Sequence, residues 1–299
     1  MDSTAPKIGF IGLGHMGGAM VGRLLQGGHA VYGTSQSRER AQSLIDDGLQ
    51  WRDTPREVAQ AADVVFTSLP DDRAVDDVAS GPAGILAGLT GDKIWVDVST
   101  ISPRASRELA ARAHDLGMTM LEAPVSGSVP QVQSGTLTIM VGGDEQAYAR
   151  VEPILRVLGT PSHVGDNGQA QVLKLAINIS LAVQMLALSE GLLLAERAGM
   201  DTEAVLDVMT RSPIASPMLK ARAPLVLDPQ HEAWFDIGLM QKDIGLALDT
   251  ARELHVPLPT AGRADEMLSV AKSLGYERRD LAAMFRVLDQ MTTPHQDSC

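Results

Sequence analysis

The sequence predicts an α/β domain with a mostly parallel sheet, followed by an all-helical domain. Three observations support this fold class. Short, apolar, β-branched runs alternate with helical patterns through the first half of the 299-residue chain. A glycine-rich turn joins the first apolar run to the first helical pattern. After residue 168 no strand pattern recurs, and the apolar segment 169–198 contains one glycine and no proline.

The elements of the first half can be placed in order from their periodicity. Residues 54–57 (Thr-Pro-Arg-Glu) form a capping box with proline at the first helical position, so a helix begins there. Strands that alternate with helices indicate a mostly parallel sheet covered on both faces. The predicted strands are 7–11, 30–32, 63–68, 94–98, 118–121 and 137–141, and helical patterns include 15–26, 38–46, 102–116 and 144–158.

The second half is predicted to be helical throughout. Segment 169–198 is interpreted as one long helix with apolar positions almost all round, so we expect it to be buried on several sides. Shorter helices are predicted at 202–210, 217–227, 239–254, 260–274 and 281–291, and residues 292–299 are expected to be disordered. The predicted domains are 1–165 and 166–299, and the long helix joins them.

Composition and charge exclude several classes of partner. The net charge is −12 and the pI is near 5.0, and no run of Lys or Arg forms a basic stripe. We therefore expect neither nucleic acid nor an anionic membrane surface as a partner. We also predict no metal site.

The cysteine content and the N-terminus favour a cytoplasmic protein. The one cysteine, Cys299, cannot form an intramolecular disulfide, which suits a reducing compartment. The segment 1–7 is short and polar, and it lacks the apolar core that a secretion signal contains. The long apolar segment is interrupted by polar residues such as Lys174 and Glu190, which favours a buried helix over a membrane span.

A G-x-G-x-x-G spacing follows the first predicted strand directly. This spacing between a strand and a helix is typical of a Rossmann-type dinucleotide-binding domain. The first glycine allows the tight turn, the second lets the backbone approach a pyrophosphate, and the third lets the helix lie against the strand. The helix N-terminus offers N–H groups and partial positive charge to the phosphates. The predicted cofactor-binding residues here are Gly12, Leu13, Gly14, His15, Met16 and Gly17; the alternative is a purely structural turn.

The end of the second strand bears on the choice of cofactor. NAD-binding domains usually place an acid there to bind the ribose, but this chain has no acid before Glu39. The hydroxyls of Ser35 and Ser37, together with Arg38, could instead hold a 2′-phosphate, so NADP is favoured over NAD. In the alternative interpretation Ser37 caps the next helix and Arg38 is solvated, and both can be true at once.

Further loops follow the third, fourth and fifth predicted strands. Ligands of open α/β sheets bind at the carboxyl ends of strands, so Leu69, Pro70 and Thr100 are candidate cofactor contacts, although such short motifs can also be plain loops. The turn Ser126-Gly127-Ser128 exposes hydroxyls and backbone N–H groups together, which suits a carboxylate.

Lys174 is the most informative single residue. It lies near the start of the long apolar helix, and Gln171 and Asn178 at i−3 and i+4 share its face. A lysine on a mostly buried helix either reaches solvent through its stem or has a function. The pair Lys242-Asp243 is, by its pattern alone, more typical of a solvated helix face.

The glycine-rich turn, the Ser-Gly-Ser turn and the segments around Lys174 and Lys242 together closely resemble those of the β-hydroxyacid dehydrogenases. This is the family of 3-hydroxyisobutyrate dehydrogenase and of glyoxylate/succinic semialdehyde reductases. The resemblance covers about residues 7–291. Four blocks match in order, at residues 9–17, 123–137, 168–178 and 242–249. The resemblance implies a Rossmann domain, a helical second domain, and homodimers or homotetramers built on the long helix.

The resemblance also implies roles for individual residues. Lys174 would be the general acid/base, Ser126, Gly127 and Asn178 would hold the carboxylate of a small substrate, and Lys242 would lie near nicotinamide and substrate. Because a lysine at its ordinary pKa of about 10.4 is a poor base at neutral pH, we expect burial and nearby cations to lower that pKa.

Two positions depart from the family pattern, and both concern the substrate. Ser128 replaces the second glycine of Ser-Gly-Gly, and Ile179 replaces the second of two asparagines. We include Ser128 among the predicted substrate contacts. The function predicted is reversible hydride transfer between nicotinamide and a small β-hydroxy acid or semialdehyde. The alternatives are a non-catalytic NADPH-binding regulator or redox sensor, and an imine reductase on the same fold, against which Lys174 argues.

Overall fold

The computed structural model describes residues 6–228 and 232–292, and Cys299 lies outside them. The chain divides into two compact units, residues 1–174 and 175–299. They are called the N-terminal and C-terminal units below, and each is described separately. The helix α9 begins in the first unit and continues into the second.

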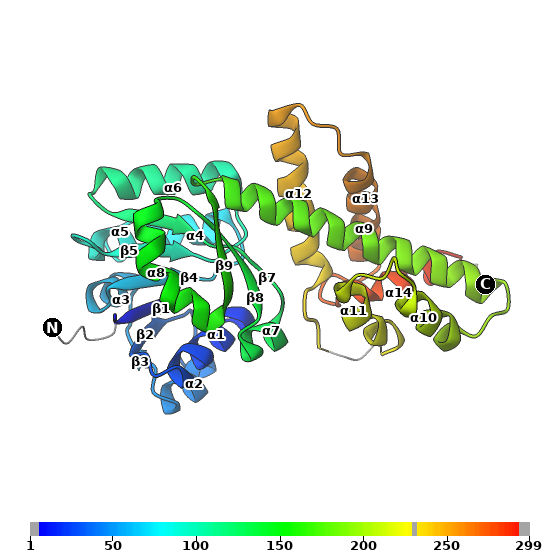
Figure 1. Cartoon of the computed structure of the whole chain (residues 1–299), viewed down its shortest axis with the longest axis horizontal. Helices are drawn as coiled ribbons and strands as arrows, with labels where there is room; N and C mark the ends of the chain where they lie inside the picture. Colours follow the sequence, from blue (N-terminus) through cyan, green and yellow to red (C-terminus); the bar gives the residue numbers. More distant parts are fainter. Residues whose placement is uncertain (1–5, 229–231, 293–299) are drawn as a thin grey trace, which may run out of the picture. The chain divides into compact units, whose positions relative to one another are not determined.

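The N-terminal unit is built on a nine-stranded sheet in the order β3-β2-β1-β4-β5-β6-β8-β7, with β9 paired to β8 (Figure 1). Neighbouring strands from β3 to β6 are parallel, while β8 runs antiparallel to β6 and β7, so the sheet is mostly parallel as predicted. The strands are β1 (Ile8–Ile11), β2 (Val31–Thr34), β3 (Gln50–Trp51), β4 (Val64–Thr67), β5 (Ile94–Asp97), β6 (Thr119–Glu122), β7 (Val125–Ser126), β8 (Leu137–Gly142) and β9 (Gly159–Gly165).

Helices cover both faces of this sheet, which explains why the central strands β1, β4 and β5 are buried at every position and mostly apolar. On one face α1 and α8 pack on residues such as Phe10 and Phe66, and on the other α3 to α6 pack on residues such as Trp95. The helices are α1 (His15–Gln26), α2 (Gln42–Asp46), α3 (Pro55–Ala61), α4 (Asp72–Ala79), α5 (Ile85–Gly88), α6 (Pro103–Asp115), α7 (Val129–Ser134) and α8 (Glu145–Leu158), with a 3-10 turn η1 (Glu39–Ala41).

The order of the strands positions the site. Strand β1 pairs with β2 on one side and β4 on the other, so chain order reverses at β1. In open α/β sheets, ligands bind beyond the carboxyl ends of the strands at such a switch point. The glycine-rich turn follows β1 at this point.

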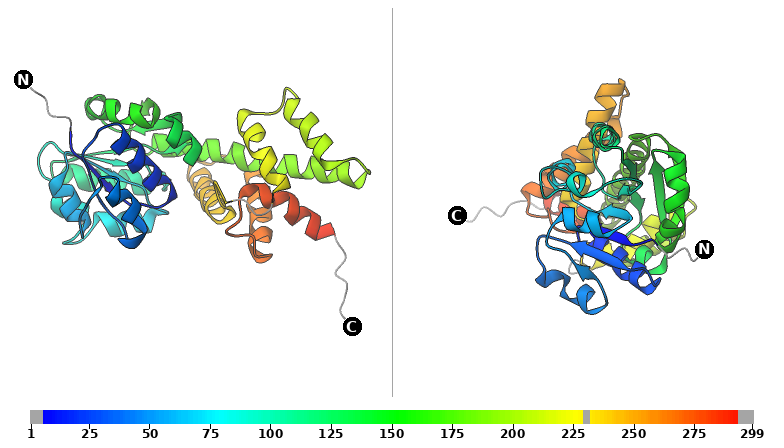
Figure 2. Two further views of the ribbon diagram at one scale, coloured as in Figure 1. Left: turned by 90° about the horizontal axis from the view of Figure 1, so that it is seen from below. Right: turned by 90° about the vertical axis from the view of Figure 1, so that its left-hand side faces the viewer.

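The C-terminal unit is helical, as predicted. Its core contains Met185 and Leu192 of α9, Met240 and Ile244 of α12, and Phe285 of α14. In Figure 2 (left), α10 and α11 lie on one side of α9, and α13 and α14 on the other. The helices are α9 (Gln169–Arg197), α10 (Thr202–Arg211), α11 (Pro217–Leu227), α12 (Ile237–Leu254), α13 (Pro259–Ser273) and α14 (Met284–Thr292), with a 3-10 turn η2 (Leu281–Ala283).

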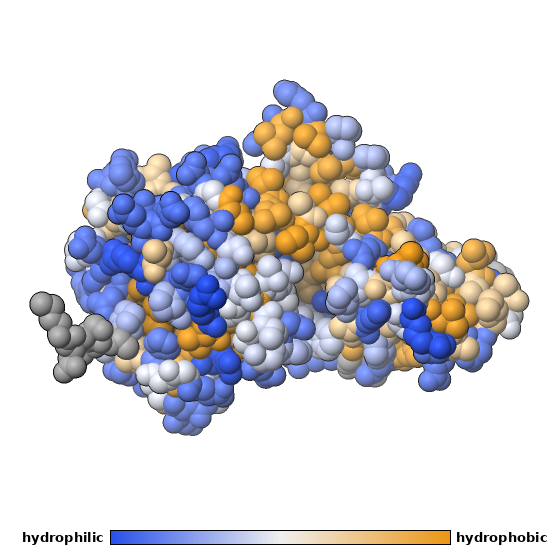
Figure 3. Space-filling view, in the orientation of Figure 1, coloured by the Kyte–Doolittle hydropathy of each residue, from blue (hydrophilic) through white to orange (hydrophobic). Residues whose placement is uncertain are grey.

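The burial of α9 differs from the prediction. Only 39% of the most apolar 18-residue stretch of this helix is buried. Leu173 and Leu194 are 39% and 74% exposed. Apolar surface covers part of α9 and α12 in Figure 3. The helices of one unit pack around only part of the circumference of so long a helix. By length and composition α9 could also cross a membrane, but core helices of soluble proteins meet the same criterion.

Candidate active site

The glycine-rich turn has the geometry that its spacing predicts. Gly12 has φ +94°, and a Cβ there would lie 2.3 Å from the carbonyl oxygen of Ser68. A Cβ at Gly17 would lie 2.0 Å from the carbonyl oxygen of Gly12, so these two positions require glycine for packing. A Cβ at Gly14 would meet nothing within 4 Å among the described residues. Gly14 therefore borders open space, which leaves room for a pyrophosphate to approach the backbone.

The start of α1 differs from the starts of the other long helices of this unit. Side chains of Thr54, Asp71, Ser102 and Asp144 cap α3, α4, α6 and α8. The N-cap of α1 is Gly14, which supplies no side-chain cap, and the first turn contains no acid within the part of the chain that the structure describes. An uncapped N-terminus beside open space fits an anionic group, since its N–H groups need acceptors.

The loop after β2 contains the residues predicted to choose between NADP and NAD. The hydroxyl of Ser35 accepts a hydrogen bond from the Leu13 N–H at 3.5 Å, so this loop contacts the glycine turn. Ser37 Oγ accepts from the Arg40 N–H at 3.3 Å and so supports η1, and the exposed Arg38 lies over the Trp51 ring at 5.9 Å. The Ser37 hydroxyl also donates to Glu39 Oε2 at 3.4 Å.

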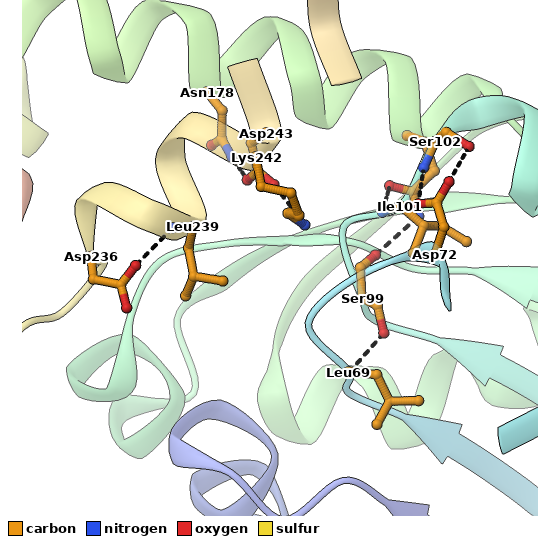
Figure 4. A network of polar contacts seen from close by, with 11 residues as sticks. Leu69, Asp72, Ser99, Ile101, Ser102, Asn178, Asp236, Leu239, Lys242 and Asp243 are labelled. Atoms are coloured by element: carbon orange, nitrogen blue, oxygen red, sulfur yellow. Dashed lines mark hydrogen bonds and ion pairs between the residues drawn. The ribbon is translucent and has the colours of Figure 1, made fainter. Parts of the chain in front are cut away.

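A buried carboxylate links the ends of β4 and β5. Asp97 Oδ1 accepts hydrogen bonds from Thr67 Oγ1 at 2.6 Å and Ser99 Oγ at 2.7 Å. Ser99 Oγ in turn accepts from the Leu69 N–H at 2.9 Å, a bond drawn in Figure 4. Asp97 is fully buried, and this burial raises its pKa to about 6. The network fixes the loops that contain Leu69 and Thr100, two predicted cofactor contacts.

The turn predicted to bind substrate follows β7 (Val125–Ser126). Gly127 has φ +131°, and a Cβ there would lie 2.7 Å from Leu137, so a larger residue is disfavoured. Ser128 is the N-cap residue of α7, and its N–H donates to Gln131 Oε1 at 2.8 Å. The departure from Ser-Gly-Gly therefore has a local structural role in starting α7.

Lys174 lies in the second turn of α9, and its side chain is mostly buried, with 9% of the residue exposed. The first turn is bonded to the sheet at two places. Glu122 Oε1 at the end of β6 accepts from the N–H groups of Ala170 and Gln171, and the Gln171 side chain bonds the loop after β5. The helix that carries the candidate general acid/base is thus attached to the carboxyl edge of the sheet.

In the C-terminal unit, the predicted site residues Asn178 and Lys242 both contact the carboxylate of Asp243. Asn178 Nδ2 donates to Asp243 Oδ2 at 2.5 Å, and Lys242 Nζ lies 2.8 Å from Asp243 Oδ1 (Figure 4). Asn178 and Asp243 are 1% and 2% exposed, whereas the Lys242 side chain is 24% exposed. The Asp243 carboxylate thus holds both the Lys242 ammonium group and the Asn178 side chain in place. The pairing also replaces the solvated-face interpretation of Lys242-Asp243.

Sequence reasoning assigned no role to the buried acids Asp97, Glu122 and Asp243. A signal was present for the first two, because each ends an otherwise apolar central strand. Within residues 6–228 and 232–292, no three His, Cys, Asp or Glu side chains group as metal ligands do.

The parallel sheet and the glycine-rich turn after β1 define a dinucleotide-binding protein of the Rossmann class. Residues 7–170 match the family model for the NAD binding domain of 6-phosphogluconate dehydrogenase. Residues 168–288 match the model described as NAD-binding of NADP-dependent 3-hydroxyisobutyrate dehydrogenase. The chain belongs to the β-hydroxyacid dehydrogenase family and is an NAD(P)-dependent oxidoreductase.

Relatives of known name support this assignment. The chain is 34% identical to 2-(hydroxymethyl)glutarate dehydrogenase of Eubacterium barkeri, over 96% of both chains. It is 35% identical to 2-hydroxy-3-oxopropionate reductase of Escherichia coli, over 95% of this chain and 98% of the relative. The solved structure of Psf3 in complex with NADP+ and 2-OPP superposes with a TM-score of 0.86 at 30% identity, covering 94% of this chain and 99% of that one.

Two further similarities concern the alternative functions. Human cytokine-like nuclear factor N-PAC is 32% identical over 95% of this chain, which spans 51% of that protein. An imine reductase from a Pseudomonas species is 22% identical over 95% of this chain and all of that one, with a TM-score of 0.63, which shows the shared fold alone.

Proposed function

We propose that this protein catalyses reversible hydride transfer between a nicotinamide and the carbinol carbon of a small β-hydroxy acid, with NADP the favoured cofactor. Lys174 is the proposed general acid/base. The observation that carries the proposal is the mostly buried Lys174 on a helix whose first turn is bonded to the loops at the carboxyl edge of the sheet.

The proposed cofactor ligands lie in the N-terminal unit, except Lys242 of the C-terminal unit. The turn from Gly12 to Gly17 would hold the pyrophosphate on the N-terminus of α1. Ser35, Ser37 and Arg38 would hold the 2′-phosphate, and Leu69, Pro70 and Thr100 would contact the nicotinamide half. When bound, the nicotinamide supplies or accepts the hydride, and this chain supplies positioning and the proton.

Lys174 handles the proton of the reaction. In reduction its ammonium group donates a proton to the carbonyl oxygen as hydride reaches the carbonyl carbon, and in oxidation its amine takes the hydroxyl proton. Ser126, Gly127 and Ser128 are proposed to hold the substrate carboxylate through hydroxyl and N–H groups, and Asn178 and Lys242 are proposed as further substrate ligands. Fixed orientation of both reactants supplies much of the acceleration in such a reaction.

A panel of small hydroxy acids and semialdehydes with both cofactors tests the proposal, followed by the absorbance of reduced nicotinamide. We expect Lys174→Ala to abolish turnover and to leave cofactor affinity unchanged. Lys220→Ala, which removes an exposed lysine of α11, is the control. Turnover of Lys174→Ala near that of the unmodified chain would contradict the assigned role.

The same panel addresses the regulatory alternative, for which the similarity to N-PAC is the observation in favour. Tight NADPH binding without turnover of any compound would support a non-catalytic NADPH-binding protein. We further propose that the protein is cytoplasmic and forms a homo-oligomer. The oligomer is supported by the exposure of Leu194 and Leu173 on α9. Sedimentation of the purified chain tests the oligomeric state.

A further inference from the structure

The carboxylate of Glu122 connects the sheet to the start of α9. Its Oε1 accepts from the Ala170 N–H at 2.7 Å and the Gln171 N–H at 3.2 Å, and its Oε2 accepts from the Ser106 hydroxyl. Glu122 is fully buried at the end of β6. A strand residue 48 positions earlier in the chain therefore caps the N-terminal amides of this helix.

The structure makes room for this carboxylate. Gly142 of β8 pairs with Glu122 across the sheet, and a Cβ at Gly142 would lie 2.6 Å from Glu122 Oε1. Charge-assisted hydrogen bonds to backbone N–H groups are stronger than neutral ones, and a negative group is favoured at a helix N-terminus. Removal of the carboxylate would leave buried N–H groups of α9 without an acceptor.

A second contact fixes the rotation of the same helix. Gln171 Nε2 donates to the carbonyl oxygen of Ser99 at 3.0 Å, and Gln171 Oε1 accepts from the Ile101 N–H at 3.3 Å. Lys174 is three residues after Gln171 and four after Ala170, and thus one helical turn beyond both anchors on that side of α9. The position and direction of Lys174 therefore depend on the bonds that Glu122 and Gln171 make.

We propose that Glu122 is a positioning residue of the hydride-transfer reaction, which holds the first turn of α9 so that Lys174 is oriented for proton transfer. The role depends on the proposed function of Lys174. Ser106 orients the Glu122 carboxylate through the hydrogen bond to its other oxygen. A misplacement of about 1 Å in a reacting group can cost about 100-fold in rate, so the anchor matters for catalysis beyond folding.

Steady-state kinetics of Glu122→Ala and Glu122→Gln test the proposal. We expect kcat of Glu122→Ala to fall about tenfold or more, with KM for NADPH within about twofold of the unmodified value. Glu122→Gln keeps an oxygen acceptor and should recover part of the activity. It is also the variant to rely on if Glu122→Ala does not fold.

Two variants separate positioning from general stabilisation. Asp144→Ala removes the side-chain cap of α8, and Asp280→Asn weakens the buried pair with Arg222 in the C-terminal unit. Both are expected to lower Tm with kcat of the folded enzyme unchanged. Equal kcat losses in these variants and in the Glu122 variants would show that Glu122 has a merely structural role.

Amide hydrogen exchange provides a readout that does not require turnover. Glu122→Gln should speed exchange in the first two turns of α9, and Asp144→Ala should not. Faster exchange in Glu122→Gln with an unchanged kcat would overturn the positioning role of Glu122. The proposed role of Lys174 as general acid/base would not be affected by that result. Absence of turnover by the unmodified chain would overturn the proposed function and this role with it, and the exchange data would then describe the anchor alone.

Discussion

The hydroxyl of Thr67 donates a 2.6 Å hydrogen bond to the buried carboxylate of Asp97, and this bond joins the carboxyl ends of β4 and β5. The Trp95 indole donates in turn to the Thr67 oxygen at 2.9 Å. Asp97 Oδ2 accepts no hydrogen bond from any residue that the structure describes. A fully buried acid with one oxygen left without a donor is disfavoured in its charged form.

Asp97 therefore makes stability depend on pH. Its pKa is raised from 3.8 to about 6, so the folded chain binds a proton between these values that the unfolded chain has released. Its contribution to the free energy of unfolding falls as pH rises from about 4 to about 6. The total change is about 3 kcal/mol, from about 1.4 kcal/mol per pKa unit.

Asp97→Asn removes this contribution, because an amide does not titrate. The difference in unfolding free energy between Asp97→Asn and the unmodified chain is expected to move in favour of the variant from pH 4 to pH 7. Urea unfolding at several pH values measures it, and Asp144→Asn, at an exposed helix cap, is the comparison. A difference that stays constant over this range would contradict the raised pKa of Asp97.

Two glycines of the cofactor turn are expected to respond differently to alanine. At Gly17 the added Cβ would lie 2.0 Å from a carbonyl oxygen, so Gly17→Ala should destabilise the fold by about 1–3 kcal/mol. At Gly14 the Cβ enters open space, so Gly14→Ala should keep its Tm but lose about tenfold or more in NADPH affinity. Thermal unfolding and calorimetric titration measure the two effects. Gly22→Ala in the middle of α1, also open, is the control, and an affinity loss there equal to that of Gly14→Ala would remove the link to the pyrophosphate.

Arg38 is expected to distinguish the two cofactors. A guanidinium bond to a phosphate contributes about 1.5–3 kcal/mol, so Arg38→Ala should weaken NADPH binding by about tenfold or more and leave NADH binding unchanged. Binding titrations with both cofactors test this, with Arg104→Ala on the exposed side of α6 as the control. An equal loss for NADPH and NADH would place Arg38 away from the 2′-phosphate.

Local sequence patterns predicted most of the elements. The apolar period and glycine spacing placed α1 at 15–26, where the structure has it, and the proline and capping box placed the start of α3. Strand β9 was not predicted, since Gly159–Gly165 contains proline, histidine and no apolar alternation. Its pairing with β8 alone leaves it at an edge, where a proline is tolerated.

The candidate site also contains features that local sequence predicted and features that it did not. The glycine turn and Lys174 could be predicted because each is a short motif with its own structural context. The anchor of Lys174 could not, because Glu122 contacts residues 48 and 49 positions later in the chain. The partner of Asn178 is likewise 65 positions away, at Asp243. Contacts at such separation depend on the assembled fold rather than on local pattern.

Asn178 is expected to act on substrate rather than cofactor. Loss of a hydrogen bond to a charged group costs about 1.5–3 kcal/mol, so Asn178→Ala should lower kcat/KM for the acid substrate by about tenfold or more. KM for NADPH should remain unchanged, because the proposed cofactor ligands lie in the N-terminal unit, apart from Lys242. Ser189→Ala, which removes another buried polar group of α9 bonded only locally to Met185, should leave both constants unchanged. A rise in KM for NADPH equal to the loss for substrate would assign Asn178 to the cofactor instead.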